Sequence, residues 1–170
     1  MENLFFKNIL IFIILIITGA FFSLLALRLI LFIINRGKSL ADSLKNNSIT
    51  ILTSSVIVSL GVIFSKLYDP LIEITRILGD GESYLLNSIK YISLFLILAF
   101  ISWFTIIGSS VSLFSLMTKG VNEIEEIKKD NWKLSVLLSA LIIMLTIMAT
   151  SPILGALEAI IPYPDIPNIN

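Results

Sequence analysis

The sequence contains no cysteine and no histidine, and it has few charged residues for its length. Without cysteine there is no disulfide bond and no thiol nucleophile. Without histidine there is no imidazole to act as a general base or a metal ligand. Only 14% of the residues are charged and the formal net charge is zero. A basic surface that would bind nucleic acid is therefore not predicted.

Charge is scarcest in four long apolar runs. A helix of roughly 20 apolar residues crosses the hydrocarbon core of a bilayer, which is about 30 Å thick. With 56% hydrophobic residues overall, the sequence predicts an all-α, polytopic membrane protein with four transmembrane helices. Its 170 residues are predicted to form a single membrane domain, since four spans leave no room for a soluble one. The runs are about Ile9–Ile34, Ile49–Phe64, Ile89–Met117 and Leu134–Ala149.

The two halves of the sequence carry similar landmarks in the same order, which predicts an internal duplication. Each half has a turn ending in Gly after its first span, an Asn before its second span, and a Pro soon after that span. Because each copy holds an even number of spans, we expect two parallel helical-hairpin repeats, at about 9–78 and 89–161. The landmarks are Asn35-Arg36-Gly37 and Thr118-Lys119-Gly120, Asn47 and Asn131, and Asp69-Pro70 and Ser151-Pro152.

Short segments at the ends of the spans and outside them also have a predicted structure. Asn47 and Asn131 are predicted helix caps, because an Asn at a helix start accepts hydrogen bonds from free backbone N–H groups. Apolar residues at helical spacing predict a short interfacial helix after Lys66, with Ile153–Ile161 as its counterpart. The tail at 162–170 is rich in Pro and is predicted to be extended and flexible.

No Asp or Glu lies within any of the four spans. Carriers coupled to ions or protons usually place ionisable residues inside the bilayer. Intramembrane hydrolysis needs a base or a metal motif, and this sequence has neither. We therefore predict a non-catalytic protein with no catalytic residue, no metal site and no cofactor.

Arg28 is the one charged residue within an apolar run. On a lipid-facing surface its long side chain would reach up to the headgroups. Alternatively, Arg28 faces the bundle, where it pairs with an acidic residue of the other loop or lines a water-filled vestibule. Both interpretations stay open.

A stripe of small polar residues follows the third span. Ser102, Thr105, Ser109 and Ser112 succeed one another at steps of three, four and three, so they share one helix face. Small residues at this spacing let transmembrane helices approach closely, which favours helix packing. A hydroxyl-lined conduit in an oligomer is the alternative interpretation.

Other residues of the spans and loops are predicted to take part in packing. Ser55 and Ser59 form a second small pair, and Trp103, near mid-span, is expected to pack against another helix. In the second loop, Ile124 and Ile127 share one side of a short amphipathic segment. That segment is either a solvated connector or a docking face for a cytoplasmic partner.

The orientation follows from the Lys and Arg residues of the short loops, which are enriched on the cytoplasmic side. Seven Lys and Arg residues lie in the two hairpin loops, and four lie on the opposite side of the membrane. We therefore expect the hairpin loops in the cytoplasm and both termini outside. The first group is Arg36, Lys38, Lys45, Lys119, Lys128, Lys129 and Lys133, and the second is Lys7, Lys66, Arg76 and Lys90.

The second half also resembles a known family, in Lys119-Gly120 and in the segment Glu125-Glu126-Ile127-Lys128-Lys129-Asp130-Asn131 that opens an apolar span. These residues resemble the signature of the domain of unknown function 350 family, small bacterial inner-membrane proteins made of paired two-helix repeats. The resemblance implies that fold and location, and it implies no catalytic mechanism. Some members are encoded near membrane-remodelling proteins of the phage-shock type, which implies a role in membrane maintenance. The first repeat departs from the pattern, since Ser39–Lys45 is far less acidic.

Two classes of function follow. The first is a scaffold or anchor in a membrane complex, with the lipid bilayer, further copies of the chain, or other membrane and cytoplasmic proteins as partners. The second is an oligomeric pore or channel lined by the Ser and Thr residues of the third span. A colicin-type immunity protein, which is also small and spans the membrane several times, is a distant third.

Overall fold

The computed structural model describes residues 2–34, 40–43, 45–78, 84–118 and 122–161, and this part of the chain is helical without a β-strand. Four helical segments are long and apolar enough to cross a membrane, as predicted: Phe5–Ile34, Asn47–Ile77, Leu86–Met117 and Trp132–Glu158. The predicted tail at 162–170 and the two predicted Gly turns lie outside the described residues, in full or in part. The helices are α1 (Glu2–Ile34), α2 (Leu40–Ser43), α3 (Asn47–Ser65), α4 (Tyr68–Ile77), α5 (Tyr84–Met117), α6 (Glu123–Lys128) and α7 (Trp132–Glu158).

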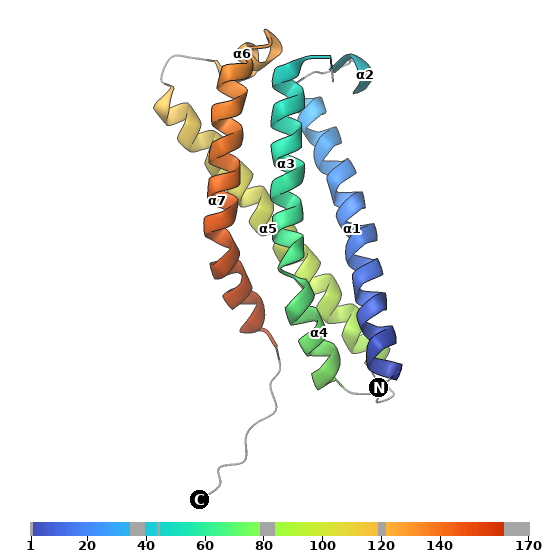
Figure 1. Cartoon of the computed structure of the whole chain (residues 1–170). Coiled ribbons are helices and arrows are strands. Elements are labelled where there is room, and N and C mark those ends of the chain that lie inside the picture. The colour runs from blue at the N-terminus through green and yellow to red at the C-terminus, as the bar shows by residue number, and fades with distance from the viewer. Residues whose placement is uncertain (1, 35–39, 44, 79–83, 119–121, 162–170) are drawn as a thin grey trace, which may run out of the picture.

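The long helices form a bundle in which α3 and α7 run opposite to α1 and α5 (Figure 1). α3 and α7 lie side by side as a parallel pair and make the most extensive contact of any two elements. α1 packs against α3 and α4, and α5 packs mainly against α7. α5 is 34 residues long and crosses the bundle obliquely (Figure 1), as expected of a helix longer than the hydrocarbon core is thick.

Small polar residues line the contact between α3 and α7. Ser55 shares one face of α3 with Ile51, whose carbonyl oxygen accepts a hydrogen bond of 3.5 Å from Ser139 Oγ of α7. Ser55 and Ser59 are both buried, which confirms the packing role predicted for this pair. Small side chains let two helix backbones approach closely in an apolar medium. The most extensive contact between helices in the bundle therefore includes small hydroxyl residues beside larger apolar ones.

An aromatic cluster fills the middle of the bundle and joins α1, α3 and α5. The ring of Phe22 lies 5.6 Å from that of Phe64 and 4.7 Å from that of Phe100, centroid to centroid. Phe100 lies 5.4 Å from Trp103, whose indole Nε1 donates a hydrogen bond of 2.9 Å to Ser59 Oγ. Trp103 is buried, so the expectation that it packs against another helix is confirmed. The bundle interior at this level is packed with side chains.

Pro70 and Pro152, which are both predicted to follow a span, have different positions in the structure. Pro70 lies in the first turn of α4, where its missing N–H breaks no helical bond, and α3 ends a few residues earlier. α4 then packs against α1 and α5, and five of its residues are buried. Pro152 lies inside α7, which continues to Glu158. The separate helix predicted for Ile153–Ile161 is therefore wrong, because α7 runs through the Pro, as transmembrane helices tolerate.

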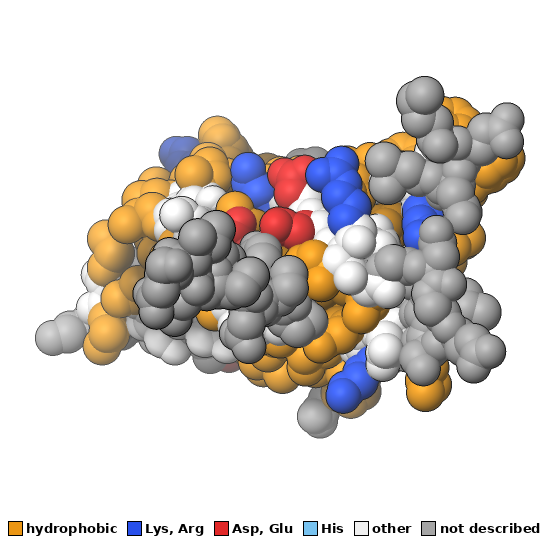
Figure 2. Space-filling view, turned by 90° about the horizontal axis from the view of Figure 1, so that it is seen from below, with side chains coloured by type: hydrophobic (Ala, Val, Ile, Leu, Met, Phe, Trp, Pro, Cys, Tyr) orange, Lys and Arg blue, Asp and Glu red, His pale blue; other side chains and the backbone are white. Residues whose placement is uncertain are grey.

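The outer surface of the bundle matches a lipid environment. Large apolar side chains are exposed along its flanks, among them Phe21 and Leu24 of α1 and Phe104 of α5. Seen from the end at which α4 lies, acidic and basic side chains gather on the end face and the flanks are apolar (Figure 2). An apolar belt bounded by a charged end is the surface that a membrane-spanning bundle needs.

Replacing Ser55 by Leu tests the contact between α3 and α7. A larger side chain forced into a packed interface costs about 1–3 kcal/mol. Ser54 is exposed next to it, so Ser54→Leu is the matched control and should leave stability nearly unchanged. The measurement is unfolding of both purified variants in detergent micelles. Equal stability of the two variants would contradict the close contact.

Candidate functional site

A polar cluster joins the start of α3 to the corner between α6 and α7, and we call it the clasp. It consists of Asn46, Asn47 and Ser48 from α3, Asp130, and the backbone carbonyls that end α6. Asn46 Oδ1 accepts a hydrogen bond of 2.9 Å from the backbone N–H of Ile49, and its Nδ2 donates to the carbonyl oxygens of residues 127 and 128 at 3.1 and 3.3 Å. One side chain thus caps α3 and holds the end of α6.

Asp130 forms the other half of the clasp. Its Oδ1 accepts a hydrogen bond of 2.8 Å from the backbone N–H of Ser48, and its Oδ2 accepts one of 3.4 Å from Asn47 Nδ2. Its φ of 61° is left-handed, a conformation that Asp tolerates better than most residues. α3 and α7 are parallel, so their positive N-terminal dipole ends lie next to each other. The Asp130 carboxylate lies at both ends and offsets that repulsion.

Glu126 stabilises the corner that precedes α7. Its Oε2 accepts a hydrogen bond of 3.0 Å from Asn131 Nδ2, and its Oε1 pairs with Lys129 Nζ at 3.1 Å. The bond from Asn131, followed by that from Lys129, lowers the pKa of the Glu126 carboxyl. A lowered pKa means that this stabilisation is present above the pKa of the unfolded chain. It is lost as the pH falls through the lowered pKa of the folded state.

The two predicted helix caps need correction. The N-cap of α3 is Asn46, whereas Asn47 is the first residue of the helix and donates to Asp130. Asn131 occupies the N-cap position of α7, but its side chain makes no capping bond to the backbone and donates to Glu126 instead. In the tandem Asn46-Asn47 either residue has the right side chain for a cap, and only the backbone geometry decides between them.

The stripe of the third span lies mostly on the outside of α5. Ser102 is half-buried, whereas Thr105, Ser109 and Ser112 are exposed. The face of α5 that packs inside the bundle is a different one, formed by Phe95, Ala99, Trp103, Ile106, Ser110 and Phe114. Within one chain, the stripe therefore faces the surroundings.

A shallow groove of about 280 Å³ runs beside the stripe, between α5 and α7. Thr105 and Ser109 form its α5 side, and Leu145, Met148 and Ala149 form its α7 side. The Thr105 hydroxyl donates to the carbonyl oxygen four residues earlier at 2.9 Å. That bond satisfies its donor without water, so the groove suits an apolar or small-residue helix face.

Arg28 is exposed on α1, and its position on the helix explains this. Ala26 and Ile30, two residues before and after it, turn toward the bundle, so Arg28 lies on roughly the opposite face of the helix. In a single chain, the Arg28 side chain therefore lies outside the bundle interior. Its distance from Ile34, the end of α1, is about 9 Å at 1.5 Å per residue, which the side chain can cover to reach headgroups.

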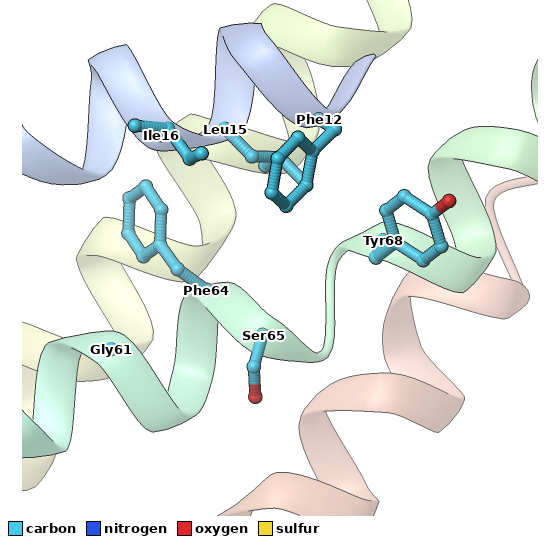
Figure 3. Close-up of a pocket in the computed structure, with 7 residues that line it drawn as sticks. All are labelled: Phe12, Leu15, Ile16, Gly61, Phe64, Ser65 and Tyr68. Atoms are coloured by element: carbon cyan, nitrogen blue, oxygen red, sulfur yellow. The ribbon is translucent and has the colours of Figure 1, made fainter. Parts of the chain in front are cut away.

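A second groove, of about 470 Å³, lies between α1 and the α3–α4 junction (Figure 3). Phe12 and Ile16 of α1 point toward Phe64, while Ser65 and Tyr68 lie at its α4 end (Figure 3). Phe12 and Ile16 are more than half exposed. The groove is therefore an open apolar surface rather than an enclosed site.

The described residues contain no group of three or more Asp, Glu, Cys or His side chains that could hold a metal ion. Most buried hydroxyls with a hydrogen bond donate to carbonyls of their own helix, as Thr53, Ser110 and Thr146 do. Such hydroxyls are engaged structurally and lack the adjacent base that a nucleophile needs.

Comparison with known proteins gives no match to any family model, curated protein or solved structure. The resemblance to the domain of unknown function 350 family therefore stays a prediction, resting on the residues between Lys119 and Asn131.

Two substitutions of Asp130 test the clasp. Asp130→Ala removes the acceptor for Ser48 N–H and the charge at the two helix ends, and loss of a cap costs about 0.5–2 kcal/mol. Asp130→Asn keeps an acceptor and should lose less. Asp42→Ala, which breaks an exposed ion pair with Lys45, is the control and should cost little. Thermal unfolding in micelles measures the stability of all three variants. If Asp42→Ala lowers the stability as much as Asp130→Ala does, the clasp is refuted.

Proposed function

We propose that the protein is a non-catalytic membrane component that docks other transmembrane helices, as a scaffold or anchor of a membrane complex. The observation that carries this proposal is the exposed stripe of α5 beside the groove with α7. Thr105, Ser109 and Ser112 are small polar residues on a flank that also carries large apolar side chains such as Phe104 and Leu116. Small residues on a lipid-facing helix are the usual contact surface for another helix.

The partner helix belongs to a second copy of the chain or to another membrane protein. A role in membrane maintenance is part of the proposal through the resemblance to the domain of unknown function 350 family. The proposed duplication, at about 9–78 and 89–161, is supported by the packing of α1 on α3 and of α5 on α7, each pair joined by one loop.

A pore between copies is the second candidate, and the same exposed stripe favours it. Within one chain the interior is filled by the aromatic cluster around Phe100 and Trp103, so a conduit would need several copies. Ser112 Oγ donates to the carbonyl oxygen of Gly108 at 2.8 Å, and two turns earlier Thr105 Oγ1 donates to that of Ile101 at 2.9 Å. Hydroxyls satisfied in this way do not require water, which supports docking over conduction.

The location proposed is the bacterial inner membrane, with the loops that contain α2 and α6 in the cytoplasm and both termini outside. It rests on the seven Lys and Arg residues in those loops against four on the other side. A reporter that is active only outside the cytoplasm should be active when fused after Asn170. The same reporter inserted into the loop at 121–130 should be silent. The opposite pattern would reverse the orientation.

Substitution of Ser109 separates docking from conduction. Ser109→Leu should disrupt assembly, because the larger side chain keeps the partner helix away. Ala20, which is exposed on α1, supplies the control: Ala20→Leu should leave assembly intact. The measurement is the size of the complex extracted in mild detergent.

Labelling gives the second half of that test, since the chain has no native cysteine. Ser109→Cys should resist a water-soluble thiol reagent, whereas Lys128→Cys on the exposed end of α6 should react. Rapid reaction at position 109 together with an intact oligomer in Ser109→Leu would reject the docking role and favour the pore.

A further inference from the structure

An apolar cavity of about 210 Å³ lies at the end of the bundle where α6 is found. α1 and α5 meet at Phe22 and Phe100, whose ring centroids are 4.7 Å apart, and diverge from there toward α6 (Figure 1). The cavity occupies the wedge between them. α3 and α7 form its back wall, and α6 closes its end through Ile124 and Ile127. The remaining side faces outward between α1 and α5.

Exposure of the lining residues shows which way the cavity opens. At its floor, Val56, Leu138 and Ile142 are only 2, 3 and 0% exposed. At its rim, Ile33 of α1 and Val111 of α5 are 61 and 44% exposed. The mouth is thus made of large apolar side chains on the flank of the bundle, the surface that faces lipid.

With the start of α3 at the edge of the hydrocarbon layer, the floor of the cavity would lie within that layer. Val56 lies nine residues after Asn47, which begins α3, and this corresponds to about 13 Å along the helix. Half of the hydrocarbon core is about 15 Å thick. Glu123 is the one polar residue of the lining, and it lies on α6, at the end that faces the headgroups. The cavity thus has a charged residue at the end near the headgroups and apolar residues along the rest of its length, in the same order as the headgroup and acyl chain of a lipid.

We propose that this cavity binds a segment of one acyl chain of a bilayer phospholipid, which enters between α1 and α5 while the rest of the lipid stays in the bilayer. An apolar cavity of about 150 Å³ stays free of water and takes up small hydrocarbons, and this one is larger and open to the bilayer. One turn of an α-helix, about 10 Å wide and 5.4 Å long, occupies roughly 420 Å³, so a helix could lie across the mouth but could not enter a cavity of about 210 Å³. The proposal needs only the membrane location and is independent of the docking role of the α5 stripe.

The open groove of Figure 3 provides the internal reference for a test. Phe12 and Ile16 are exposed there and would contact any lipid that surrounds the protein. The floor residues Leu138 and Ile142 are buried and can be reached only by a chain inside the cavity. Contact with the floor therefore distinguishes a bound acyl chain from surrounding lipid.

The experiment uses the full chain in phosphatidylcholine vesicles with a small fraction of phosphatidylcholine that carries a diazirine near the middle of one acyl chain. After irradiation, peptide mass spectrometry maps the adducts. We expect adducts on Leu138 or Ile142 as well as on Phe12. Val111→Trp, which blocks the mouth, should lose the floor adducts and keep those on Phe12. Val136→Trp is the matched control, since Val136 is exposed to the same degree on α7, and it should keep both.

Three results would overturn the proposal. In the first, Phe12 is labelled and the floor is not, in the unmodified chain. In the second, floor adducts persist in Val111→Trp. In the third, Val136→Trp abolishes the floor adducts as fully as Val111→Trp does. The unmodified chain decides the question alone if Val111→Trp fails to fold, which its helical circular dichroism will reveal.

Discussion

The parallel contact between α3 and α7 is the constraint on which the rest of the bundle depends. Two parallel helices place like dipole ends next to each other, and this arrangement is unfavourable unless an anion lies between them. Asp130 supplies the anion, and it also accepts the backbone N–H of Ser48. Asn46 adds the second connection, from α3 to the end of α6. With that end fixed, α1 packs on α3 and α5 packs on α7, and α1 and α5 meet each other at Phe22 and Phe100.

Below the clasp, small hydroxyl residues lie among larger apolar side chains where α3 and α7 meet. Ser139 Oγ donates to the carbonyl oxygen of Ile51, and Leu52, Val56, Leu138 and Ile142 are buried on the same two helices. Several buried hydroxyls of α3 and α7, such as Ser55 and Thr146, donate to carbonyls of their own helix and so keep their donors satisfied. Burial of this kind costs little and leaves the backbones close together. Ser48 Oγ and Ser135 Oγ are buried without a hydrogen-bond partner among the described residues. Large aromatic side chains join α1, α3 and α5 in the cluster of Phe22, Phe64, Phe100 and Trp103.

The sequence predicts the helical spans well because length and apolarity are properties of single segments. The burial of Trp103 and of the pair Ser55 and Ser59 could also be predicted, since bulky or small residues at mid-span have few other roles. The bonds of Asp130 could not, because Ser48 lies 82 residues away and no local pattern links the two. The prediction that α7 ends before Pro152 was wrong. A Pro ends helices in water more often than in a membrane, where neighbouring helices and local adjustments compensate for the backbone hydrogen bond that the Pro removes.

Residues outside the interior show a different limit of sequence reasoning. The spacing of Thr105 and Ser109 places them on one face of α5, but the face that enters the bundle is fixed by Trp103 and its neighbours. Periodicity identifies faces and does not say which neighbour each one meets. The same holds for Arg28, whose place on the outside of α1 follows from the burial of Ala26.

The separation of Ser48 and Asp130 along the chain has a consequence for biosynthesis. Ribosomes add about 5–20 residues per second, so the 82 residues between them take roughly 4 to 16 s to appear. During that interval the first hairpin is in the membrane with the serine face of α3 uncovered and the start of α3 lacking one of its two capping groups. The nascent protein therefore passes through a stage at which this face of α3 is exposed, and arrival of the second hairpin ends that exposure.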